Sequence, residues 1–213
     1  MGARSSQSRG PGLNKTDGHL LEYFRNTFGA GGGGTNYVTP EGLTATGGVI
    51  SDYTVGADAY RAHIFTSSGA FNVSEIGDYG SNVEYLVVAG GGGGGGSNGG
   101  GGGAGGLRTN LAGNPRTNST AFPVSTSPGI YPVSIGAGGA YGVGVNATGT
   151  NGGNSSFGPI SCNGGGMGGT EGQGSGGAGG SGGGGNGWNP PSSGGAGNSP
   201  TPYSPEQGFG GNN

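Results

Sequence analysis

Short stretches of β-branched and aromatic residues dominate positions 37–89 and predict strands there. Val49–Val55 is one such stretch. Tyr60–Thr66 and Ala70–Ile76 stand on either side of Ser67-Ser68-Gly69, a short link that contains glycine. Two strand-like segments this close together predict a β-hairpin formed by those two segments.

Three later segments also have strand patterns. Val83–Ala89 is apolar on both faces over its last five residues, which predicts a central strand covered on both sides. Residues 131–135 alternate between apolar and polar, and Pro132 favours an edge position because proline gives no N–H to a ladder. Residues 157–162 predict one more strand.

The second half of the chain consists largely of glycine. Residues 1–89 hold 16 of the 63 glycines, and residues 90–213 hold the other 47. Runs such as Gly90–Gly96 and Gly99–Gly103 lack the every-third-residue spacing of collagen. An isolated glycine run should stay disordered, because glycine loses the most conformational entropy on folding and buries no side chain. Order therefore requires neighbouring backbones, and we expect packed polyglycine-II-type helices that hydrogen-bond to one another.

The first 36 residues predict an attachment arm. Arg4, Arg9 and Lys15 lie in an acid-free, polar segment of residues 1–16. Asp17 is a candidate cap for a short helix with Leu20, Tyr23, Phe24 and Phe28 at helical spacing, and an extended segment docking on a partner is equally compatible with the pattern. In either form, the apolar residues expected to fill a groove on the partner are Leu20, Leu21, Tyr23 and Phe24. Residues 31–34, all glycine, form a hinge.

These patterns together predict a mainly β protein, with a small antiparallel β-sandwich-like unit, packed polyglycine-II-type segments and an extended N-terminal arm. The predicted regions are the arm and hinge at 1–36, the strand region at 37–89, and the glycine-rich region at 90–213, with strands at 131–135 and 157–162.

Charge argues against several kinds of partner. Charged residues make up 8% of the chain and the formal net charge is −3, so no basic patch for nucleic acid is expected. Residues 1–30 lack the apolar core of a signal peptide, and the longest apolar run, Tyr85–Ala89, is too short to cross a bilayer. We expect neither a secretion signal nor membrane insertion.

The sequence holds no recognisable catalytic, cofactor or metal site. The only lysine, Lys15, follows Asn14 and so does not complete a phosphate-binding loop. His63 has Asp58 and Ser67 nearby, but its strand context favours a histidine on a sheet face over a triad member. Two histidines and one cysteine are too few for a typical zinc centre. Cys162 is expected to be a small buried residue, and the chain is expected not to be an enzyme.

Isolated aromatic residues among glycine and asparagine are candidates for surface recognition. Aromatic rings stack on sugars and anchor protein interfaces, and packing on neighbouring glycine helices is the alternative. The candidates are Tyr141, Trp188 and Tyr203.

The order of strand segments and glycine runs over about residues 60–166 resembles the glycine-rich domain of tail-fibre and other virion proteins of bacteriophages, including marine cyanophages. The matching stretches are His63–Val73, Val83–Gly96, Gly99–Arg108, Tyr131–Gly139 and Gly152–Gly158. The resemblance implies a β-rich unit with packed glycine helices in a particle-surface protein that usually works as an oligomer.

The expected function is therefore that of a non-enzymatic phage structural protein, a tail-fibre or adhesin-like component assembled in the host cytoplasm and released by lysis. Its expected partners are other virion proteins and a host surface glycan or protein. The chain is also expected to associate with further copies of itself, and a trimer would suit it. A capsid decoration (head fibre) protein is the alternative within the virion. A free ice- or glycan-binding protein is the alternative outside it.

Overall fold

The computed structural model describes residues 41–114, 121–172, 174–187, 191–200 and 203–212. The attachment arm, including Arg4, Arg9, Lys15, Leu20, Leu21, Tyr23 and Phe24, lies outside the described residues. Gly42–Asn213 forms one compact unit, which contains both the strand region and the glycine-rich region. The unit is mainly β, with antiparallel sheets and no helix among the described residues.

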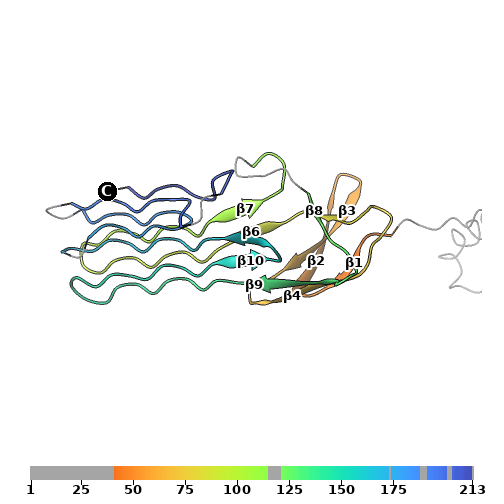
Figure 1. The fold of residues 1–213 in the computed structure, drawn as a ribbon, viewed down its shortest axis with the longest axis horizontal. Helices are drawn as coiled ribbons and strands as arrows, with labels where there is room; N and C mark the ends of the chain where they lie inside the picture. The colour runs from red at the N-terminus through yellow and green to blue at the C-terminus, as the bar shows by residue number, and fades with distance from the viewer. Residues whose placement is uncertain (1–40, 115–120, 173, 188–190, 201–202, 213) are drawn as a thin grey trace, which may run out of the picture. The chain divides into compact units, whose positions relative to one another are not determined.

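The largest sheet has five antiparallel strands, in the order β1-β4-β9-β10-β11 (Figure 1). Its strands are β1 (Thr44–Thr46), β4 (Gly69–Glu75), β9 (Ile130–Ser134), β10 (Ser155–Phe157) and β11 (Ile160–Cys162). Three two-stranded sheets accompany it: β2 (Val49–Val55) with β3 (Asp58–Ile64), β5 (Asn82–Val83) with β8 (Phe122–Pro123), and β6 (Leu86–Val88) with β7 (Leu107–Thr109).

Two small hydrophobic clusters form the core. The first contains Ala45, Phe71, Val73, Val124 and Val133, and the second contains Tyr85, Val87, Ala89, Ile160 and Cys162. Phe122 and Phe157 pack against both clusters, with their ring centroids 5.0 Å apart in an edge-to-face arrangement. Such aromatic pairs add to the stabilisation from burial itself, so these two rings join the sheets into one sandwich-like unit.

The strand predictions need several corrections. Asp58–Ile64 pairs with Val49–Val55 and not with Gly69–Glu75, so the predicted hairpin has the wrong partners. The two-residue link Gly56-Ala57 explains this pairing, because Gly56 has a φ of +63° and two-residue hairpin turns need a residue with positive φ. The predicted central strand at Val83–Ala89 is also wrong, since it divides into β5 and β6, and β6 pairs only with β7 in the described chain.

Two further corrections concern β9 to β11. Strand β9 lies in the middle of its sheet and not at an edge. Pro132 is tolerated because β10 pairs only as far as Val133, so no N–H of residue 132 is needed, and the Pro132 carbonyl accepts the N–H of Gly158. The segment 157–162 is not one strand: it contains the last residue of β10, the turn at 158–159 and all of β11, since Gly158 reverses the chain with a φ of +52°.

Beyond the strands, glycine-rich tracts lie side by side in a bundle (Figure 1). We call the tracts 89–96, 99–106, 136–142, 147–153, 163–170, 174–187, 192–198 and 207–212 the glycine bundle. Within the tract 89–96, the N–H groups of Ala89, Gly92 and Gly95 bind carbonyls of 99–106, at 2.8–3.0 Å. The N–H groups of Gly90, Gly93 and Gly96 bind carbonyls of 147–153, also at 2.8–3.0 Å.

Carbonyl groups of the tract 89–96 accept hydrogen bonds from two further tracts, 136–142 and 163–170. Gly91 accepts the N–H of Gly139 at 2.8 Å, and Gly90 accepts the N–H of Gly165 at 2.8 Å, with further bonds three residues along. Bonds that return to the same neighbour at every third residue are the signature of a helix with three residues per turn. The predicted polyglycine-II packing is thus confirmed, and the tract 89–96 has four neighbouring tracts.

Close backbone approach explains why the tracts are glycine. A Cβ at Gly93 would overlap the carbonyl of Ala140, and one at Gly102 would overlap the carbonyl of Gly92. A Cβ at Gly101 would meet nothing within 4 Å, and Ala104, three residues on, is exposed. The period of three therefore also separates positions that must be glycine from positions that point outward.

Candidate functional site

The turns at one end of the glycine bundle gather into a surface that we call the tip, made of residues 97–98, 141–146 and 171–172 (Figure 1). The Asn98 side-chain amide donates to the Glu171 carboxylate at 3.0 Å. Gly172 lies beside the Asn146 side chain. The buried Thr170 hydroxyl donates to the carbonyl of Gly96 at 2.9 Å. These contacts fix turns that are far apart in the sequence against one another.

The turn at 141–146 presents apolar side chains to solvent. Tyr141 is 72% exposed, Val143 is 77% exposed and Val145 is 72% exposed. The tight turn depends on positive φ values at Gly144 (+95°) and Asn146 (+61°). An exposed tyrosine followed by two exposed valines, on a tip that also carries amide and carboxylate groups, can stack on a sugar ring or pack against a protein while the polar groups bind hydroxyls.

Among the sequence candidates for recognition, Tyr141 is the one at the tip. Val143 and Val145 were not predicted, although their alternation with glycine on the approach to Asn146 is a signal for an exposed turn. Trp188 lies outside the described residues.

Tyr203 is engaged within the chain. Its hydroxyl lies 2.9 Å from the Ser161 hydroxyl, and the Arg108 guanidinium lies 4.3 Å from its ring centroid. Its backbone N–H donates to the Asn198 side chain at 3.0 Å. With its ring and its hydroxyl both in contact, Tyr203 contributes packing between β11 and the following glycine tracts, and its recognition role stays a prediction.

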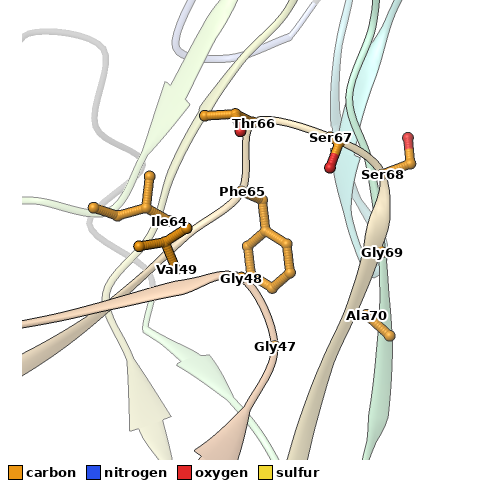
Figure 2. A pocket seen from close by; sticks show the side chains of 10 residues that line it. All are labelled: Gly47, Gly48, Val49, Ile64, Phe65, Thr66, Ser67, Ser68, Gly69 and Ala70. Carbon is orange, nitrogen blue, oxygen red and sulfur yellow. The ribbon is translucent and has the colours of Figure 1, made fainter.

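A shallow pocket of about 270 Å³ lies where the β2–β3 hairpin joins β4 (Figure 2). Residues 47–49 and 64–70 line it, and the Phe65 ring lies close to the backbone of Gly47 and Gly69. None of these lining residues is acidic, basic, histidine or cysteine. The pocket therefore supplies apolar contact and serine or threonine hydroxyls, but no group that would act as an acid, a base or a metal ligand.

His63 and Cys162 have structural surroundings. The Nδ1 atom of His63 lies 2.7 Å from the carbonyl of Gly47, and its ring packs edge-on against Phe71 with centroids 5.0 Å apart. Cys162 is fully buried, and this burial raises the pKa of its thiol to about 11. A protonated, inaccessible thiol is a poor nucleophile. Cys162 is thus the small buried residue that the sequence predicts.

The described residues contain no group of three or more His, Cys, Asp and Glu side chains able to hold a metal ion. In the same part of the chain, no helix has the length and hydropathy needed to cross a membrane.

Comparison with known proteins identifies the family of the glycine-rich region. A family model described as a glycine-rich domain matches residues 66–213. No curated protein and no solved structure matches the chain. The matched span covers the glycine bundle with its tip, and most of the strands around it. Since the match extends over more than half of the sequence, the chain belongs to the glycine-rich domain family.

Proposed function

We propose that this protein is a non-enzymatic structural component of a bacteriophage virion surface, a tail-fibre or adhesin-like part whose tip contacts the host. The observation that carries the proposal is the exposed apolar turn of Tyr141, Val143 and Val145, held at one end of a bundle built from backbone hydrogen bonds. Large side chains exposed in a small group are typical of a binding surface.

The bundle is suited to present such a tip. Each tract is tied to its neighbours by N–H to carbonyl bonds at every third residue, so little freedom is left in the backbone beneath the turns. The chain enters the described unit next to β1, and in Figure 1 the tip lies at the opposite end of that unit. A contact surface far from the point of attachment is what an adhesin needs.

The arm supplies the proposed attachment. Arg4, Arg9 and Lys15 would meet acidic groups of another virion protein, and Leu20, Leu21, Tyr23 and Phe24 would fill an apolar groove on it. This part of the proposal is supported by the sequence pattern and by the resemblance to phage proteins.

Binding of the labelled full-length protein to host cells tests the tip. We expect the triple variant Tyr141→Ser, Val143→Ser and Val145→Ser to bind at least about tenfold more weakly, because anchor residues in an interface contribute most of its affinity. Tyr79→Ser is the matched control, since Tyr79 is 77% exposed and lies outside the tip. Loss of binding after periodate treatment of the cells identifies a glycan, and loss after protease treatment identifies a protein. Unchanged binding by the triple variant contradicts the proposal.

Purified virions separate the adhesin from the alternatives. A handful of copies per particle supports a tail component, whereas one copy per capsid lattice site supports the decoration protein. Absence from virions, together with thermal hysteresis or glycan binding by the isolated chain, would favour the free ice- or glycan-binding protein.

A further inference from the structure

The β2–β3 hairpin is the least covered part of the described unit. Its strands pair only with each other among the described residues (Figure 1). Every residue of β2 is exposed. A two-stranded hairpin alone is marginally stable in water, so such an element gains most from a partner that covers it. One face of the hairpin is also mainly apolar, and its two strands carry central residues of opposite charge.

One face of the hairpin is mainly apolar. Side chains alternate between faces along a strand, and the register pairs Val49 with Ile64, Ser51 with Ala62, Tyr53 with Tyr60 and Val55 with Asp58 on this face, so that its one carboxylate, Asp58, lies next to the turn. We call Val49, Tyr53, Val55, Tyr60 and Ile64 the apolar hairpin face; their exposed fractions run from 40% for Tyr60 to 65% for Val49. The two tyrosine rings stack with centroids 5.4 Å apart.

The opposite face carries one ion pair. Asp52 stands opposite Arg61, and the guanidinium contacts both carboxylate oxygens, at 2.7 and 2.8 Å. Both side chains are more than half exposed. The pair lies in the middle of both strands, so each strand has one charged residue at its central position.

Hairpin geometry determines which backbone groups point outward. In a two-residue hairpin, the pair next to the turn, here Val55 and Asp58, exchanges hydrogen bonds, and the pairs then alternate. The N–H and C=O groups of Ile50, Asp52 and Thr54 therefore face away from β3. On β3, those of residues 59, 61 and 63 face away from β2. Each edge thus offers three matched donors and acceptors to another strand.

Charge selects how a second copy can pair. Antiparallel pairing of β2 with another β2 in full overlap places Asp52 opposite Asp52, and β3 with another β3 places Arg61 opposite Arg61. Like charges directly opposite one another destabilise a sheet. Pairing β2 with the β3 of a second copy instead places Asp52 opposite Arg61 and brings the outward-facing groups of both edges into register.

We propose that the β2–β3 hairpin is the self-association site of this protein, where β2 of one copy pairs with β3 of the next. This head-to-tail contact is heterologous, and such a contact gives a closed ring when the rotation from one copy to the next closes. The right-handed twist of paired strands curves the sheet. In the proposed trimer, three hairpins close a six-stranded ring with the apolar hairpin faces inside and Asp58, next to the turn, at the rim of the ring. The proposal extends the virion role but does not depend on it, since a free protein with this hairpin would associate in the same way.

The mass of the full-length protein in solution tests the proposal, by analytical ultracentrifugation over a range of concentrations. We expect a discrete trimer. Thr54→Pro removes an outward N–H of β2 without touching the bonds to β3, and it should shift the protein to monomer. Tyr53→Glu should do the same by placing charge inside the ring. Tyr79→Glu, at a more exposed tyrosine outside the hairpin, should leave the trimer intact.

A charge exchange tests the register. Asp52→Arg alone should raise the protein concentration at which half of the trimer has dissociated by at least about tenfold, because it places like charges opposite one another. Adding Arg61→Asp should restore the wild-type value. Circular dichroism and the unfolding midpoint show in each case that the rest of the unit is folded. A wild-type monomer, dimer or open polymer overturns the proposal, and so does a trimer that Thr54→Pro and Tyr53→Glu leave unchanged. In either case the tip can still bind host cells, so this failure is distinct from failure of the adhesin proposal.

Discussion

The side-chain carbonyl of Gln207 accepts a hydrogen bond from the backbone N–H of Asn163 at 2.7 Å, and both residues are buried. The backbone carbonyl of Gln207 accepts the N–H of Leu107 at 3.0 Å. One residue near the end of the chain thus joins the start of β7 to the tract 163–170. The Gln207 side chain thus supplies the hydrogen-bond acceptor that a neighbouring glycine backbone supplies elsewhere in the bundle.

Gln207→Leu should destabilise the protein. The change removes a buried acceptor in a site that water does not reach, which costs about 1–3 kcal/mol of unfolding free energy. Chemical denaturation measures the loss. Thr148→Ala is the control, because it removes an exposed hydroxyl from the same bundle and should change stability by less than about 0.5 kcal/mol. Equal effects of the two changes would contradict a structural role for the Gln207 amide.

Two adjacent glycines should respond in opposite ways to alanine. The Cβ of Gly102→Ala would overlap the carbonyl of Gly92, and separating the two tracts should cost about 1–3 kcal/mol. The Cβ of Gly101→Ala meets nothing within 4 Å, and its smaller unfolded-state entropy should leave stability unchanged or raised by about 0.4–1 kcal/mol. Unfolding midpoints of the two variants decide the matter. Similar losses in both would mean that the tracts are not packed as described.

Amide hydrogen exchange should show a period of three along the tract 89–96. Gly92 and Gly93 donate to neighbouring tracts at 2.8 and 2.9 Å, whereas Gly91 and Gly94 have no acceptor for their N–H groups among the described residues. Exchange through opening is slow for bonded amides and fast for amides that face water. Residue-resolved exchange by NMR should therefore find Gly91 and Gly94 fast between slow neighbours. Uniformly fast exchange along the tract would rule out the packed bundle.

Strand-like segments predicted the β character of the chain and the glycine runs predicted the glycine packing, but neither pattern predicted which strands pair. The pairing of Val49–Val55 with Asp58–Ile64 depends on Gly56, a single glycine in a chain where glycine is too common to mark a turn. Strand β9 is central although Pro132 suggested an edge, because the adjacent strand β10 is short and ends before the proline. Local patterns carry no information about the length of a strand that arrives from elsewhere in the sequence.

The contacts least predictable from the sequence are those in which a side chain, in place of a neighbouring backbone carbonyl, accepts an N–H of a glycine tract. Asn151 accepts the N–H of Met167 at 2.8 Å, and Asn154 accepts the N–H of Gly164 at 2.9 Å. These asparagines are three residues apart, one turn of a polyglycine-II helix, so their spacing is a usable signal once that helix is assumed. The tip was half predictable: Tyr141 is conspicuous among glycines, whereas the exposure of Val143 and Val145 follows only from the turn.

Stability at high pH should depend on Cys162. Burial raises the pKa of its thiol from about 9 to about 11, so between these values the unfolded chain loses a proton that the folded chain retains. Fewer protons bound in the unfolded state mean that stability falls as the pH rises. The loss begins near pH 9, ends near pH 11 and amounts to about 2–3 kcal/mol. Below pH 9 the thiol is protonated in both states and contributes no slope.

Cys162→Ala isolates this contribution from those of all other ionisable groups. The variant should be less stable at pH 8 because it leaves a small cavity, and its deficit relative to wild type should shrink by about 2–3 kcal/mol by pH 11. Labelling with a thiol reagent at pH 8 gives an independent check, since the native protein should react only as fast as it opens. A deficit that stays constant with pH would show that the folded and unfolded thiols ionise alike.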